Sequence, residues 1–160
     1  MENLLNNLII FGAKYLLVVI VIIAFWYFIK QSQSNKKQII IFALFVFPLA
    51  YLASRIMACF YYDPRPFVDG NIIPLFPHKP DNGFPSDHAL LSAAIAAVIF
   101  YFNRKIGWLL LILAVLVGAA RVLAGVHHWI DIAGSIIIAL LISFLAYKFL
   151  LPITPRFMKK

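Results

Sequence analysis

The sequence predicts an all-α membrane protein: a polytopic bundle of about five transmembrane helices with its functional site at one membrane face. Two observations predict this fold class. Of the 160 residues, 64% are hydrophobic and only 12% are charged, which is too little polar surface for a soluble domain of this size. Hydrophobic runs of about 18 residues or more also recur along the chain, and that length crosses the hydrocarbon core of a bilayer.

The first run, 8–29, has Lys14 as its main interruption and ends in Trp26 and Tyr27, residue types that favour the headgroup level. A cleaved signal peptide is the alternative for this run. It would need a shorter hydrophobic part behind a basic leader, and Glu2 is the only charge before Lys14. Further spans are expected at 38–62, 89–102, 106–123 and 132–150, within a single domain over 1–160.

One connection, residues 63–85, differs from the short ones. It holds six of the nine prolines and three of the six acids. Proline restricts the backbone, and a loop of this length in a compact domain is usually functional. We therefore expect a structured loop at one membrane face.

The distribution of basic residues predicts the orientation, because Lys and Arg are retained in short cytoplasmic loops. With five spans, nine basic residues fall on one side: Lys30, Lys36, Lys37, Arg104, Lys105, Lys148, Arg156, Lys159 and Lys160. The other side receives all six acids. We expect the amino terminus outside and the carboxyl terminus in the cytoplasm. The net charge of +8 then lies at the ends of spans, which argues against nucleic acid as a partner.

Polar residues from two loops should meet at the outer face: Arg65, Ser86, Asp87, His88, Arg121, His127 and Asp131. Ionisable groups at the membrane border are costly and indicate function. The planar fork of Arg65 and Arg121 suits phosphate oxygens, and Ser86 starts a span whose free N–H groups favour an anion. A histidine beside a carboxylate can act as a nucleophile, and a second histidine as a general acid.

Three motifs in this order make the chain resemble the type-2 phosphatidic acid phosphatase superfamily of membrane lipid phosphatases. They are Arg65-Pro66, then Pro85-Ser86-Asp87-His88, then Arg121 with five residues to His127 and three more to Asp131. Each motif alone is weak, and the ordered set is specific. The Ser-Asp-His sequence and the short chain further resemble the bacterial undecaprenyl-diphosphate phosphatases.

The resemblance implies that His127 attacks phosphorus to form a phosphohistidine, while Asp131 orients its ring. His88 would protonate the leaving group and then activate water. Arg65, Arg121 and Ser86 would hold the phosphoryl oxygens, with Asp87 beside them at the start of the span. The resemblance implies neither a metal nor another cofactor. It places the protein in a bacterial cytoplasmic membrane with its site outside.

The substrate expected from the resemblance is a membrane lipid phosphate, with undecaprenyl diphosphate hydrolysed to undecaprenyl phosphate as the leading hypothesis. Phosphatidylglycerol phosphate, phosphatidic acid and a lipid A phosphate stay open. Two other classes also stay open. A transporter or channel would place such charges nearer the midplane on broken helices. A lipid-binding relative without activity would have lost part of the site.

Two departures from the family pattern bear on the site. The lysine that usually stands seven residues before Arg65 is Ala58 here, so one phosphate-binding cation is missing. Arg55 lies one helical turn earlier, and Lys79 in the proline-rich loop is the other candidate. Ala120 replaces the serine that usually precedes Arg121. The remaining histidines, His78 and His128, are expected to be structural or adjacent to the substrate.

Overall fold

The computed structural model describes residues 2–70 and 72–150, and its regular secondary structure is helical. The long helices are α1 (Glu2–Ile29), α2 (Gln33–Phe60), α4 (Asp87–Phe102), α5 (Arg104–Leu123) and α6 (Trp129–Leu150), and the short helix α3 covers Pro66–Asp69. By length and composition four of them, α1, α2, α5 and α6, can cross a membrane, and α4 is a shorter apolar helix of 16 residues. The predicted all-α membrane fold is confirmed.

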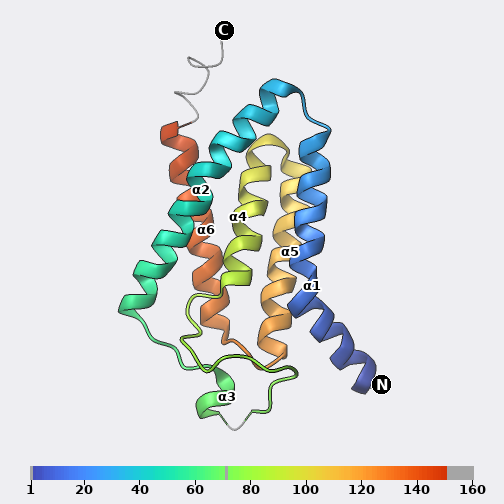
Figure 1. Ribbon diagram of the computed structural model, residues 1–160, viewed down its shortest axis with the longest axis vertical. Coiled ribbons are helices and arrows are strands. Elements are labelled where there is room, and N and C mark those ends of the chain that lie inside the picture. Colours follow the sequence, from blue (N-terminus) through green and yellow to red (C-terminus); the bar gives the residue numbers. More distant parts are fainter. Residues whose placement is uncertain (1, 71, 151–160) are drawn as a thin grey trace.

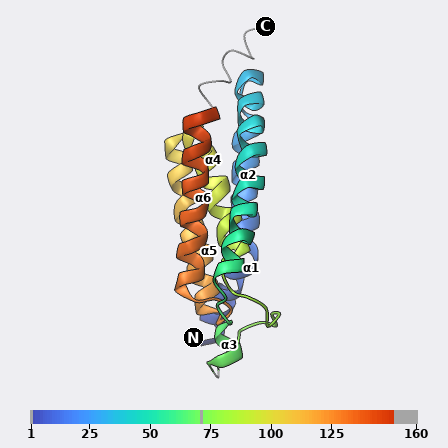
Figure 2. The same ribbon diagram turned by 90° about the vertical axis from the view of Figure 1, so that its left-hand side faces the viewer.

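Consecutive long helices run in opposite directions (Figure 1). The α2–α4 loop, which contains α3, therefore lies at the same end of the bundle as the α5–α6 turn and the start of α1, and Figure 2 shows this loop beyond the helix ends. The α1–α2 and α4–α5 turns lie at the opposite end. Of the basic residues expected on the cytoplasmic side, Arg156, Lys159 and Lys160 lie outside the described residues.

Polar caps extend the helices beyond the hydrophobic runs. The Ser32 side chain accepts a hydrogen bond from the backbone N–H of Asn35, so α2 begins at Gln33 and not near 38. Asn103 likewise accepts from Ile106 N–H at 3.1 Å and starts α5 at Arg104. Hydropathy marks the part of a helix that suits lipid, and the caps decide where the helix begins.

Helix α4 lies at the centre of the bundle. It contacts each of the other four long helices, and its residues from Ala89 to Ile99 are buried except Leu91. Its small residues at 92–94 and 96–97 allow the neighbouring backbones to approach closely, which is how helices pack in membranes. Because α4 is central, its amino-terminal end lies in the middle of the bundle end that carries the α2–α4 loop.

Candidate active site

His127 lies in the short α5–α6 turn, and Asp131 lies in the first turn of α6. The Nδ1 of His127 is 3.0 Å from Oδ2 of Asp131, and both side chains are buried. The Nη1 of Arg65 lies 3.1 Å from Nε2 of the same ring. A guanidinium can only donate, so Nε2 carries the lone pair and Nδ1–H donates to Asp131. The contacts thus select the tautomer whose free lone pair is at Nε2.

Ser86 is the second group at Nε2. It is the N-cap residue of α4, it is fully buried, and its Oγ lies 3.2 Å from Nε2 of His127. The Oγ of Ser135 in α6 contacts the carbonyl oxygens of Asp131, at 2.6 Å, and Ser86, at 2.9 Å. This buried hydroxyl ties the start of α4 to the start of α6, and so holds Ser86 against the histidine.

Two buried arginines approach the same place from different elements. Arg65, just before α3, donates from Nε to Asp81 at 2.8 Å and from Nη1 to the carbonyl of Val126 at 2.7 Å. Arg121, in the last turn of α5, donates from Nη2 to Nε2 of His78 at 2.8 Å and from Nη1 to the carbonyl of Ala13 at 3.3 Å. Within the described residues, the buried Nε of Arg121 has no acceptor.

These groups border a cavity of about 190 Å³. Its lining residues are Arg55, Ala58, Arg65, His78, Asp81, Asn82, Phe84, Pro85, Asp87, His88, Arg121 and His127. Three arginines face two carboxylates here, so the cavity has a net positive charge, and three histidines lie among them. His88, half-buried in the first turn of α4, joins the cavity as the motif order predicts.

The structure separates the two candidates for the missing cation. Arg55 lines the cavity and donates from Nη2 to Oδ1 of Asp87 at 2.7 Å. Lys79 is exposed and is not among the described residues that line the cavity. The carboxylate of Asp87 can only accept, so it contributes to an anion site by holding Arg55 or through its backbone N–H at the start of α4.

The electrostatics keep His127 and His78 neutral. Burial lowers the pKa of His127 well below its ordinary value, and the charges of Arg121 and Arg65 lower it further. Burial also lowers the pKa of His78, again with Arg65 and Arg121 contributing. At neutral pH both rings are therefore uncharged.

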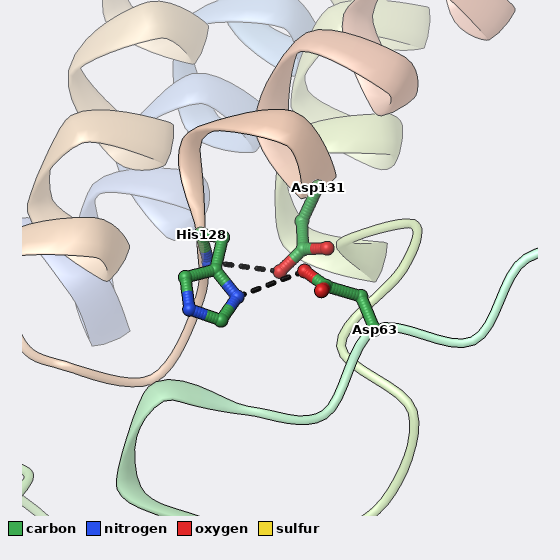
Figure 3. A group of neighbouring side chains, drawn as sticks. All are labelled: Asp63, His128 and Asp131. Atoms are coloured by element: carbon green, nitrogen blue, oxygen red, sulfur yellow. Dashed lines mark hydrogen bonds and ion pairs between the residues drawn. The ribbon is translucent and has the colours of Figure 1, made fainter. Parts of the chain in front are cut away.

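Three neighbouring residues form what we call the carboxylate cluster: Asp63, His128 and Asp131 (Figure 3). The Oδ2 of Asp131 accepts from the backbone N–H of His128 at 2.9 Å, and Nδ1 of His128 lies 2.8 Å from Oδ2 of Asp63. Burial is the main cause that raises the pKa of Asp63. Asp63 was not predicted as a site residue, because its only signal in the sequence is that it stands two residues before Arg65.

The carboxylate cluster is where a metal could bind. One ligand atom from each of its three residues lies within 4.8 Å of the others. Oδ2 of Asp131 already accepts from His127 and His128, so a cation bound there would compete with the bond that orients His127. The absence of a metal remains a prediction from the sequence.

Asn82 closes the proline-rich loop and was also missed. Its Oδ1 accepts from the backbone N–H groups of Asp63, at 2.9 Å, and Phe84, at 3.0 Å. Its Nδ2 donates to the carbonyl of Tyr61 at 3.1 Å. One amide thus joins the end of α2 to both ends of the loop, which brings Arg65 close to the start of α4.

Comparisons with known proteins show which family the chain resembles. The family model of the PAP2 superfamily matches residues 39–154. Undecaprenyl-diphosphatase BcrC of Bacillus subtilis is 33% identical over 92% of this chain and 76% of its own length. Bacitracin transport permease protein BcrC of Bacillus licheniformis is 32% identical over 87% of this chain and 68% of its own length. A crystal structure of LpxE from Aquifex aeolicus superposes with a TM-score of 0.74 at 24% identity, covering 91% of this chain and 87% of that one.

Proposed function

The chain belongs to the PAP2 superfamily, and from this premise we propose that it removes the terminal phosphate of undecaprenyl diphosphate through a phosphohistidine on His127. It is an integral membrane lipid phosphatase, as the sequence analysis predicts. The observation that carries the proposal is the convergence of the Nε2 lone pair of His127 with Arg65 and Ser86 at a positive cavity.

In the first step, Nε2 of His127 attacks the terminal phosphorus, and the bond from phosphorus to the bridging oxygen breaks. His88, which the negative charge of the bound diphosphate would keep protonated, gives its proton to that oxygen, so the lipid leaves as a monophosphate. Asp131 accepts the Nδ1–H bond throughout and stabilises the positive charge that develops on the ring.

In the second step, His88 takes a proton from water while the oxygen of that water attacks phosphorus. The bond to Nε2 breaks, and inorganic phosphate and free His127 are restored. Arg65, Arg121 and Ser86 hold the phosphoryl oxygens in both steps, because phosphoryl transfer depends mainly on positioning and charge stabilisation. The buried Nε of Arg121, which has no acceptor among the described residues, supports this role, since such a donor costs about 1–3 kcal/mol that a phosphoryl oxygen would offset.

Arg55 takes the place of the missing lysine. Its guanidinium lies at the side of the cavity where α2 faces α4 and is held by Asp87. We assign it to the inner phosphate of a diphosphate, which stays with the lipid as the leaving group.

An apolar hollow supports a lipid substrate. It has a volume of about 290 Å³ and meets the polar cavity at Asp87. Its other lining residues come from α2 and α4: Phe47, Ala50, Tyr51, Leu90, Leu91 and Ala94. A prenyl chain in this hollow would place its phosphates beside Arg55.

We also propose the orientation. The site lies at the end of the bundle opposite the α1–α2 turn, the α4–α5 turn and the carboxyl end of α6 (Figure 1). These segments hold Lys30, Lys36, Lys37, Arg104, Lys105 and Lys148. Because basic residues stay on the cytoplasmic side, the site and the amino terminus should face outward. A lipid carrier that has delivered its cargo outside would reach the site without crossing the membrane.

The test is a phosphate-release panel in detergent over undecaprenyl diphosphate, phosphatidylglycerol phosphate, phosphatidic acid and a lipid A phosphate. We expect the highest kcat/KM with undecaprenyl diphosphate, and loss of release from every lipid in His127→Ala at an unchanged unfolding temperature. A higher kcat/KM with another lipid would identify that lipid as the substrate in place of undecaprenyl diphosphate. Binding of a lipid phosphate or diphosphate without release from any lipid would favour the non-catalytic or transport alternative, and turnover by His127→Ala would exclude the mechanism.

A further inference from the structure

Of the three histidines that line the cavity, His78 is the one that belongs to no motif. It belongs to the proline-rich loop, where the sequence analysis left it as structural or adjacent to the substrate. Its Nε2 accepts from Nη2 of Arg121 at 2.8 Å. Its Nδ1 therefore carries the proton and faces the carbonyl of Lys79 at 3.4 Å.

The loop holds this histidine firmly. The backbone N–H of Leu75 donates to the carbonyl of Ala124 at the end of α5 at 3.0 Å. Phe76 is buried against Ala120, Ala124 and neighbouring residues, and the ammonium group of Lys14 in α1 lies 4.5 Å from the centre of its ring. These contacts of Leu75 and Phe76 fix the loop on α5, which carries Arg121, and on α1, whose Ala13 carbonyl accepts from Arg121.

The two buried arginines are supported in different ways. Arg65 donates to a carboxylate, Asp81, which offsets its charge. Arg121 donates to neutral acceptors, the carbonyl of Ala13 and the ring of His78. A neutral acceptor fixes the direction of a guanidinium and leaves its full charge for a ligand, whereas a carboxylate would cancel that charge.

We propose that His78 is a positioning residue for Arg121: as a neutral acceptor, it holds the guanidinium toward the phosphoryl group without neutralising it. This inference rests on the proposed function, in which Arg121 binds phosphate. The low pKa of His78, caused by burial and by Arg65 and Arg121, agrees with an uncharged ring at neutral pH.

The test compares His78→Ala, His78→Gln and His78→Glu in the full chain, with Ile73→Ala as a control in the same loop because that side chain is 90% exposed. Phosphate release from undecaprenyl diphosphate is measured together with the unfolding temperature. Losing a hydrogen bond to a charged group should lower kcat/KM of His78→Ala about 10- to 100-fold. Gln supplies a neutral acceptor near the position of Nε2 and should restore most of this loss.

Glu has nearly the same shape as Gln but carries the charge that the proposal excludes, so His78→Glu should be at least as impaired as His78→Ala. A His78→Ala variant with wild-type kcat/KM, or Gln and Glu variants with equal activity, would overturn the proposal. A wild-type protein that releases no phosphate from any lipid would mean instead that the proposed function fails. In that case the variants are compared by how far orthovanadate raises the unfolding temperature of each. An equal increase in all of them would refute the role of His78 even without an activity to measure.

Discussion

Asp131→Asn isolates the charge of the carboxylate that orients His127. In the wild-type protein one oxygen, Oδ2, accepts from both Nδ1–H of His127 and the backbone N–H of His128. The asparagine must keep its amide oxygen in that place, because its NH₂ group would meet the N–H of His128. The NH₂ then replaces Oδ1, which has no partner among the described residues. The tautomer of His127 is retained, and only the charge is lost.

The size of the effect follows from these contacts. A hydrogen bond to a charged group contributes about 1.5–3 kcal/mol and one between neutral groups about 0.5–1.5 kcal/mol. Losing the difference, about 1–2 kcal/mol, as the ring becomes positive slows formation of the phosphohistidine about 5- to 30-fold. Asp131→Ala removes the acceptor altogether and leaves the buried Nδ1–H of His127 unpaired, which costs about 1–3 kcal/mol of stability, and it also removes the acceptor of the half-buried backbone N–H of His128.

The assay is single-turnover trapping of the phosphorylated protein, with thermal unfolding in detergent alongside. We expect Asp131→Asn to unfold near the wild-type temperature and Asp131→Ala well below it. Wild-type phosphorylation in Asp131→Asn would refute the role of the charge. A catalytic histidine held in the wrong tautomer loses about 10⁴-fold in rate. A loss of that size in the rate of phosphorylation of a stable Asp131→Asn variant would refute the inference that the backbone of His128 fixes the amide.

Three further predictions concern the cation, the nucleophile and the metal. Arg55→Ala should raise KM for undecaprenyl diphosphate about tenfold while changing stability by less than about 1 kcal/mol, because its ion pair with Asp87 is exposed; an unchanged KM counts against its role. The lowered pKa of His127 means that in the substrate-free protein the ring gains a proton only below the ordinary histidine range, so an NMR titration of this ring without substrate should show no step near pH 6.5. Phosphate release should survive a chelator and fall with orthovanadate; loss with chelator that magnesium restores would point to a metal in the carboxylate cluster.

The fold class and the gathering of the site could be predicted because they depend on few physical rules. Five apolar runs with short turns must alternate in direction, so the connections after α2 and after α5 reach the same end of the bundle. Arg65, His88 and His127 could therefore be assigned to one site before any geometry was known. The helix starts were less predictable, since the capping side chains of Ser32 and Asn103 extend helices into polar sequence.

The contacts inside the proline-rich loop could not be predicted from the sequence. Lys79 and His78 are neighbours, yet the lysine faces solvent and the histidine faces Arg121. Which of them turns inward depends on how Leu75 and Phe76 dock on α5, a tertiary contact without a periodic signal. Asp63 joins the carboxylate cluster for a similar reason, because Asn82 sets the path of the chain around it.

In the proposed mechanism, the two buried arginines link substrate binding to the reactivity of His127. Without a ligand, their charges lower the pKa of His127, which keeps the ring neutral and its Nε2 lone pair weakly basic. In the proposed mechanism, a phosphoryl group bound to Arg65 and Arg121 offsets those charges. The lone pair then becomes more basic just when phosphorus lies beside it, and Asp131, already paired with Nδ1–H, meets the positive charge that forms. The neutral support of Arg121 by His78 matters here, because a carboxylate in that position would cancel part of the field before the substrate arrived.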